Sequence, residues 1–296
     1  MTIGKKIAWG FGILILMAAA LGMVAVVTMK AVQTQANLLA EGFAPESAVV
    51  GDLQDTADAA RLAVRSYGFT ADSVYLDQAH KSIDEIHKHL AEAQKLSDAH
   101  PELVKLRENL RELTPLMQTF EDLVNQTEAK NHDLAATRVT LDKNATSFVV
   151  GIDAFIDTQK NKFAAEVGTN TPPAALQERA QKLLLSSGIR CDGNLARVAV
   201  FKAQALRKPQ IIDDGVKIFD ALDVKLAQLT PLVHAETNLD QLNEVKMAAH
   251  TYCQAMKQVE DDDIALASLT AKRIEVGDQF NALMSDTMAT ANRRTV

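Results

Sequence analysis

The chain has 296 residues, a net charge of −7 at pH 7 and two cysteines. The acidic balance argues against nucleic acid or anionic lipid as the main partner, and two cysteines are too few for a disulfide-stabilised scaffold. Aromatic residues make up only 5% of the chain, while alanine, leucine, glutamine, lysine and acidic residues dominate. This composition is typical of long-helix bundles and predicts an all-α protein.

Residues 7–29 form an uncharged apolar run that directly follows Lys5 and Lys6. A helix of this length rises about 35 Å, enough to cross a hydrocarbon core of roughly 30 Å. The two lysines favour a cytoplasmic tail at residues 1–6, with the acidic remainder on the other side of the membrane. A cleaved signal peptide is the alternative, because the alanines at 18–20 resemble a cleavage site. The apolar run is too long for a signal-peptide core, so a retained anchor is the better interpretation.

Beyond the anchor, sparse proline and glycine punctuation predicts six helices. The first continues from the anchor to about Gly68, with a kink expected near Pro45, and the second ends near Ser97. The others are expected at about 101–167, 174–207, 209–231 and 237–296. Pro115 is expected to kink the third helix and Pro231 to end the fifth.

Two of the six helices are long and four are short, which predicts two four-helix bundles stacked end to end and sharing the long helices. The proximal module would comprise about 30–127 plus 260–296, and the distal module about 128–259. An internal repeat supports this division. Residues 60–64 (ARLAV) match residues 196–200 (ARVAV), so the two helical hairpins resemble copies of one another.

Polar residues interrupt the apolar core stripe of the long helices, and counting helix height places several of them beside arginines. In the proximal module Arg61, Arg65, Thr270 and Arg273 are expected at similar heights. A buried arginine needs a partner, and its planar fork binds carboxylates, so these residues form a candidate site for a ligand with carboxylate groups.

The distal module offers a comparable set. Arg197 is expected level with Arg138 and Asn144 on the third helix and with Tyr252 on the sixth. The alternative for any of these arginines is that it reaches solvent or pairs with a nearby acid. Thr127, Asn131 and the acidic run 261–263 are expected where the two modules meet, as a hydrated polar layer.

Enzyme chemistry has little support in the sequence. No glycine-rich phosphate loop, nucleophile elbow or pair of catalytic carboxylates is visible, so we expect no enzyme activity and no cofactor. No cluster of histidine, cysteine and acidic residues has convincing metal-ligand spacing. Cys191 and Cys253 lie on helices expected to be diagonal in the bundle, and we expect two buried thiols without a disulfide.

The combination of anchor, two long helices, four short helices and duplicated hairpin resembles the helical bimodular sensor domain of bacterial chemoreceptors (methyl-accepting chemotaxis proteins). The resemblance covers essentially the whole chain but is architectural. It implies a homodimer in the bacterial inner membrane, with a periplasmic sensor domain and an association face along the first helix. It also implies binding of di- or tricarboxylates at the proximal residues, and of a monocarboxylate at the distal ones.

The resemblance further implies signalling by displacement of the sixth helix, and coupling of a full-length receptor to a chemotaxis kinase and adaptor. Such a receptor would continue into a second membrane span near residues 293–296, so we expect a receptor fragment or a truncated gene product. Two alternatives stay open. One is the sensor region of a histidine kinase, and the other is a membrane-anchored adaptor bundle that binds protein partners and no small molecule.

Overall fold

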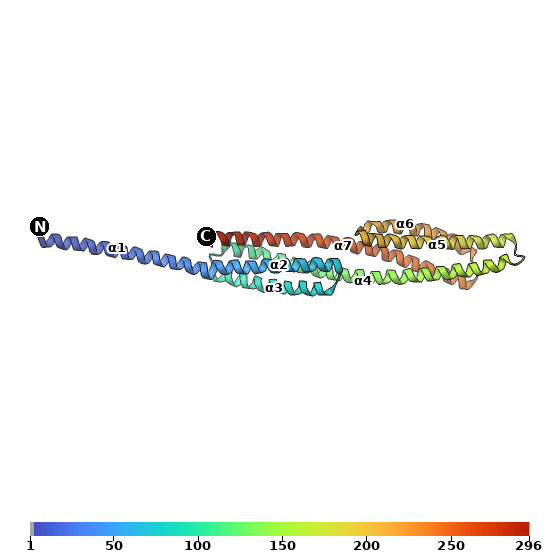
Figure 1. Cartoon of the computed structure of the whole chain (residues 1–296), viewed down its shortest axis with the longest axis horizontal. Coiled ribbons are helices and arrows are strands. Elements are labelled where there is room, and N and C mark those ends of the chain that lie inside the picture. Colours follow the sequence, from blue (N-terminus) through green and yellow to red (C-terminus); the bar gives the residue numbers. More distant parts are fainter. Residues whose placement is uncertain (1–2, 296) are drawn as a thin grey trace. The chain divides into compact units, whose positions relative to one another are not determined.

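The computed structural model describes residues 3–295, with the side chains of residues 5, 6, 8, 9, 294 and 295 excepted. Within this range every regular element is a helix, joined by short turns (Figure 1). The prediction of an all-α protein is therefore confirmed.

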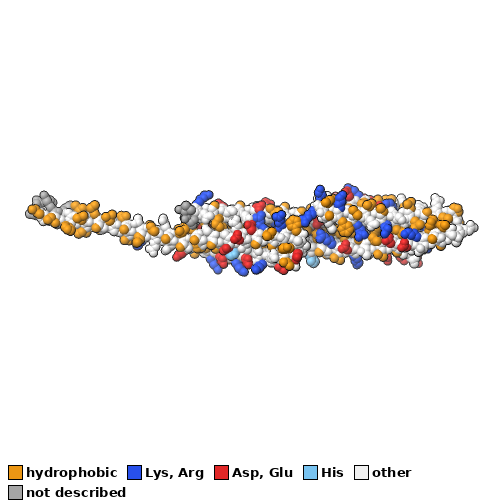
Figure 2. Space-filling model, viewed as in Figure 1, with side chains coloured by type: hydrophobic (Ala, Val, Ile, Leu, Met, Phe, Trp, Pro, Cys, Tyr) orange, Lys and Arg blue, Asp and Glu red, His pale blue; other side chains and the backbone are white. Residues whose placement is uncertain are grey.

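The N-terminal helix α1 spans Ile3–Leu38. Among the described helices, it begins the one helical stretch that is long and apolar enough to cross a membrane, and its apolar window packs against no other part of the chain. Hydrophobic side chains cover this segment in Figure 2. A helix that is apolar all round needs an apolar environment, which agrees with a membrane span.

A short π-helix, η1 (Leu39–Phe43), joins α1 to α2 (Ala44–Thr70). The Ala44 N–H donates to the Leu39 carbonyl, five residues back. Pro45 explains this widened turn, because proline has no N–H and its ring would clash with the carbonyl four residues earlier. The irregularity expected at Pro45 is thus accommodated by a π-turn, and the helical path continues.

The remaining elements agree closely with the expected boundaries. They are α3 (Ser73–Ala99), α4 (Val104–Val167), α5 (Pro173–Leu206), η2 (Pro209–Ile211), α6 (Ile212–Leu229), η3 (Thr230–Leu232) and α7 (Glu236–Thr295). The helix α6 ends just before Pro231, as predicted. Two starts differ. The helix α4 begins at Val104, because Pro101 and Glu102 form a turn, and α6 begins at Ile212, after the short 3-10 helix η2. Arg107 stabilises that turn by donating to the Pro101 and His100 carbonyls.

Two compact units divide the chain. Unit 1 comprises residues 1–124 and 272–296, and unit 2 comprises residues 125–271. The core of unit 1 is built by α2, α3, the first part of α4 and the last part of α7. The core of unit 2 is built by α5, α6, a later part of α4 and the first part of α7. Each core is therefore a four-helix arrangement to which both long helices contribute.

The two hairpins repeat at an offset of 136 residues. Ala71 and Arg207 (207 − 71 = 136) are the only described non-glycine residues with positive φ, and both cap the first helix of their hairpin at φ 53°. The buried positions of α3 recur in α6 and its extension at the same offset. Leu76, Ala79, Ile83, Ile86, Leu90, Ala93 and Ser97 correspond to Ile212, Gly215, Phe219, Leu222, Leu226, Leu229 and Val233, all buried. The internal repeat thus extends through cap and core.

The two cysteines are free, but they differ in exposure. Cys253 on α7 is half-buried, and burial raises the pKa of its thiol. Cys191 on α5 is exposed. The expectation of two buried thiols is wrong for Cys191, because the core-facing positions on either side of it are Ile189 and Gly193, which turn Cys191 to the opposite face of the helix.

Candidate functional site

A small apolar cavity inside unit 2 brings Arg197 and Tyr252 together. Seven residues from all four helices line it: Ala145 and Phe148 of α4, Gly193 and Arg197 of α5, Phe219 of α6, and Ala249 and Tyr252 of α7. Its volume is about 10 Å³, at the lower limit of what one water molecule requires. The rings of Phe219 and Tyr252 are 6.1 Å apart between centroids. Two of the predicted distal residues therefore share one cavity.

The charges around this cavity are unusual for a helical core. Burial raises the pKa of Tyr252 to about 12, while the Arg197 guanidinium opposes that shift. The phenol is consequently protonated at neutral pH and available as a hydrogen-bond donor. Arg197 is half-buried, and no carboxylate of residues 3–295 forms an ion pair with it. The site thus presents a cation and a neutral hydroxyl donor beside apolar walls.

The close approach of α5 to α4 at this cavity requires glycine. A Cβ atom at Gly193 would lie 2.2 Å from Cε1 of Phe148, well inside van der Waals contact. The absence of a side chain at Gly193 lets the Phe148 ring pack directly against the α5 backbone. Gly193 therefore shapes the cavity, a role that the spacing of apolar residues did not indicate.

The other two predicted distal residues lie elsewhere. Asn144 is half-buried and donates from Nδ2 to the Thr140 carbonyl of its own helix, at 2.8 Å. Arg138 is exposed, and its charge acts on Asp263, whose pKa is raised mainly by burial. Equal height along the helix axes did not decide which way these side chains turn, so neither residue lines the Tyr252 cavity.

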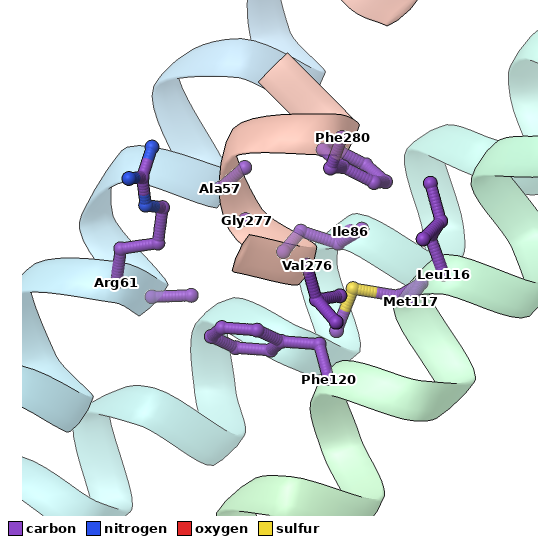
Figure 3. A pocket seen from close by; sticks show the side chains of 10 residues that line it. Ala57, Arg61, Ile86, Leu116, Met117, Phe120, Val276, Gly277 and Phe280 are labelled. Carbon is purple, nitrogen blue, oxygen red and sulfur yellow. The ribbon is translucent and has the colours of Figure 1, made fainter. Parts of the chain in front are cut away.

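Unit 1 contains a cavity of about 20 Å³, room for one water molecule. Its walls are apolar and come from all four helices, and Arg61 lies at its edge. In Figure 3 the Arg61 guanidinium lies apart from the side chains of Met117, Phe120 and Phe280. A Cβ atom at Gly277 would lie 2.9 Å from Nε of Arg61, so α7 leaves space for the arginine to cross it.

Arg61 is already neutralised by acids. Its Nη2 donates to Asp278 of α7 at 2.6 Å, and Nη1 lies 3.7 Å from Asp58 one turn earlier on α2. The side chain is 30% exposed. The alternative in which an arginine pairs with nearby acids thus describes Arg61 in this structure.

The other proximal residues divide into one buried and two exposed side chains. Arg273 is 6% exposed, and burial lowers its pKa. Its Nη2 passes 3.8 Å from the Cβ position of Gly68 on α2. Arg65 is exposed, with its guanidinium carbon 6.0 Å from the centre of the Phe69 ring. Thr270 is exposed and belongs to unit 2. Of the proximal residues, Arg61 and Arg273 are thus the two whose side chains lie between α2 and α7.

The repeat relates the two cavities. Arg61 and Arg197 occupy equivalent positions, as do Ala57 and Gly193, and all four line a cavity. The same offset relates Asp278, the acid that pairs with Arg61, to Asp142 of α4 (278 − 136 = 142). Asp142 is exposed and forms no ion pair with Arg197 within the described residues. The same arginine position is therefore neutralised in unit 1 and not in unit 2.

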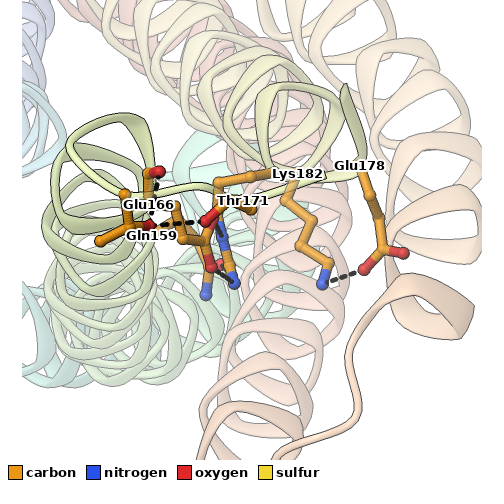
Figure 4. A network of polar contacts seen from close by, with 7 residues as sticks. Gln159, Glu166, Thr171, Glu178 and Lys182 are labelled. Atoms are coloured by element: carbon orange, nitrogen blue, oxygen red, sulfur yellow. Dashed lines mark hydrogen bonds and ion pairs between the residues drawn. The ribbon is translucent and has the colours of Figure 1, made fainter. Parts of the chain in front are cut away.

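Unit 2 also contains a network of polar side-chain contacts that was not predicted from the sequence (Figure 4). Arg179 of α5 makes a two-point contact with Glu166 of α4, with Nη2 2.6 Å and Nε 3.1 Å from the carboxylate oxygens. Its Nη1 also donates to the fully buried Gln159 side chain, at 2.5 Å. Nearby Lys182 is 6% exposed and pairs with Glu178 at 2.6 Å. The Arg179 contacts join α5 to α4 on either side of the turn at 168–172, whereas the Lys182–Glu178 pair lies within α5.

The polar residues expected as a hydrated layer include a buried aspartate that pairs with a partly exposed lysine. Asp262 is 1% exposed, and its Oδ1 accepts from Nζ of Lys130 at 3.1 Å and from Nε2 of Gln258 at 3.0 Å. Its Oδ2 and the Nδ2 of Asn131 are buried, and neither has a hydrogen-bond partner in the described protein. A buried donor and a buried acceptor without hydrogen-bond partners in the described protein are typical sites for buried water.

Searches with the sequence find no matching protein-family model and no matching curated protein. Within the described residues, no three histidine, cysteine or acidic side chains are placed to hold a metal ion.

Proposed function

We propose that this chain is the ligand-sensing region of a membrane-anchored receptor that binds small organic acids. The observation that carries the proposal is Arg197, a half-buried guanidinium that forms no ion pair with any carboxylate of the described residues, beside the protonated Tyr252 hydroxyl and an apolar cavity. A half-buried cation next to a low-dielectric wall gains from an anionic ligand, because an unpaired charge there is poorly solvated. A planar guanidinium binds a carboxylate through two parallel hydrogen bonds.

The dimensions of the unit 2 site favour a short monocarboxylate. The carboxylate would accept hydrogen bonds from Arg197 and Tyr252, and a methyl or ethyl group would enter between Phe148 and Phe219. The cavity is about 10 Å³, so a ligand must displace side chains, and a longer acid must displace more. Binding that moves helices in this way is what a sensor requires, since a ligand shifts a conformational equilibrium only by its difference in affinity for the two states.

In unit 1 we propose a site for di- or tricarboxylates at Arg61 and Arg273. One ligand carboxylate would replace Asp278 on Arg61, and another would approach Arg273, which lies one helical turn before Gly277, the α7 residue that Arg61 crosses. Replacing Asp278 would release a contact between α2 and α7, and displacement of α7 is the proposed signal. This arrangement fits a homodimeric chemoreceptor with a periplasmic sensor, and equally the sensor region of a histidine kinase.

The test is a thermal-shift screen of the full chain in lipid nanodiscs at neutral pH, with acetate, propionate, succinate, malate and citrate. Acetamide serves as the uncharged control for acetate. We expect saturable stabilisation by a monocarboxylate that disappears in Arg197→Met and persists in Arg190→Met, whose guanidinium already pairs with Asp153 at 2.6 Å. Stabilisation by a dicarboxylate should disappear in Arg61→Met.

Equal stabilisation by acetate and acetamide would contradict recognition of charge. No saturable response to any acid would favour the adaptor bundle, which binds protein partners and no small molecule.

A further inference from the structure

The ring of Phe148 on α4 rests directly against the backbone of α5, beside the unit 2 cavity. A Cβ atom at Gly193 would lie 2.2 Å from Cε1 of this ring and 2.6 Å from Cζ. Phe148 is 4% exposed, so the ring is enclosed by the core and has the α5 backbone behind it. Because a packed core has little free space, the ring cannot retreat from the cavity unless α5 separates from α4.

The other walls of the cavity limit its size in a different way. Ala145 and Ala249 carry only methyl groups, which do not reach across it. The Phe219 ring lies beside Tyr252, with 6.1 Å between the ring centroids. Moving Phe219 would therefore disturb the residue that supplies the proposed hydroxyl donor. Phe148 is thus the large side chain whose position sets the available space independently of the proposed polar contacts.

Unit 1 shows the corresponding arrangement without the glycine. Ala57 occupies the position of the repeat that is equivalent to Gly193 (57 + 136 = 193), and its Cβ atom keeps a neighbouring ring further from the helix backbone. Phe280 of α7 lines the cavity of unit 1, as Phe148 of α4 lines the cavity of unit 2. The volumes are about 20 Å³ in unit 1 and about 10 Å³ in unit 2. The smaller cavity therefore coincides with the glycine that allows a ring to approach more closely.

We propose that Phe148, seated against Gly193, limits the acids that unit 2 accepts to those of two or three carbon atoms. This limit rests on the proposed function, because Arg197 and Tyr252 must hold the carboxylate for the hydrocarbon end to enter the cavity. A cavity of about 10 Å³ is filled by a methyl group. An ethyl group requires a small displacement of the ring, and a propyl group requires one that the α5 backbone blocks. Phe148 is thus a specificity-determining residue that excludes longer acids by volume.

Calorimetric titration of the full chain in lipid nanodiscs with acetate, propionate, butyrate and valerate tests this limit. One methylene group that a pocket cannot hold changes affinity by about 10–200-fold, so the native chain should bind butyrate at least about tenfold more weakly than propionate. Phe148→Leu removes part of the wall and should raise the affinity for butyrate at least about tenfold. The affinity for acetate should change much less, because Arg197 and Tyr252 remain in place. Butyramide is the uncharged control and should bind neither protein.

Phe155→Leu is the matched control for Phe148→Leu. Phe155 lies seven residues further along α4, at the same heptad position, and it is fully buried without lining the cavity. Its replacement removes the same atoms from the same core and should leave the order of the four acids unchanged. Phe148→Met is a second variant, because a flexible unbranched side chain preserves most of the packing. It should also raise the affinity for butyrate, and melting curves establish that each variant is folded.

Three results would overturn the size limit while leaving the acid site standing. These are an unchanged order of acids in both Phe148 variants, an equal gain for butyrate in Phe155→Leu, and native binding of butyrate as tight as that of acetate. Binding of none of the four acids to the native chain or to either Phe148 variant would instead contradict the proposed function, and the size limit with it.

Discussion

Replacing Gly193 by alanine tests how closely α5 packs against α4 in unit 2. The added Cβ atom would lie 2.2 Å from Phe148 Cε1, 2.6 Å from Cζ and 3.1 Å from Cδ1. Ordinary contact begins near 3.4 Å, so the ring or the helix must move by about 1.2 Å. Phe148 is buried, with few directions open to it.

Two effects oppose each other in Gly193→Ala. Alanine gains about 1 kcal/mol over glycine in a helix interior, whereas overpacking of a well-packed core costs about 1–3 kcal/mol. Because the 2.2 Å contact places this clash in the upper part of that range, we expect a net loss of about 1–2 kcal/mol and a lower melting temperature in circular dichroism. Gly51→Ala is the matched control, because its Cβ would meet only Met288 Cε at 3.8 Å. That change should raise stability by up to about 1 kcal/mol.

A double variant separates the clash from a general effect of α5. Phe148→Leu removes the ring, so Gly193→Ala should cost less in that background, with a coupling of about 1 kcal/mol. A Gly193→Ala protein at least as stable as the native chain would refute the packing described here. Full additivity of the two changes would do so as well.

Two further changes address other polar groups of unit 2. Arg179→Ala should lower the free energy of unfolding by about 1–3 kcal/mol, because the fully buried side-chain carbonyl of Gln159 loses its donor. The control Lys217→Ala removes an exposed ion pair and should change the free energy of unfolding in urea by less than about 0.5 kcal/mol. Asp263→Asn should raise the melting temperature at pH 7, because burial raises the carboxyl pKa above its ordinary value of 3.8. The native state then binds more protons than the unfolded state just above pH 3.8, so native stability falls as pH rises through that window. The gain from Asp263→Asn should vanish below about pH 3.8 in a pH series of melting curves, and an undiminished gain at pH 3 would contradict the burial of this carboxyl.

Helix positions could be predicted from the sequence because they follow from local chemistry. Pro231 ends α6, whose last residue is Leu229. The apolar period of 3.5 residues identifies the sides of α4 and α7 that face the core. The repeat was visible in ten residues, and it extends through the caps and buried positions of both hairpins. Short-range rules of this kind do not depend on how distant segments pack.

The candidate sites were predicted less well, because helix height does not specify rotation or rotamer. Height placed Arg197 and Tyr252 together correctly, but it also included Arg138, which is exposed and does not line their cavity. It could not show that Asp278 reaches Arg61, since that contact depends on Gly277 leaving space. Tertiary packing decides these details.

Calorimetric titration of acetate into the full chain, compared with Arg197→Met and with the matched control Arg190→Met, tests most directly whether Arg197 binds a carboxylate. We expect a saturable isotherm for the native chain and for Arg190→Met, and no binding heat for Arg197→Met with its fold intact. Equal isotherms for all three proteins, or no heat from any short monocarboxylate, would contradict a carboxylate site at Arg197 and Tyr252.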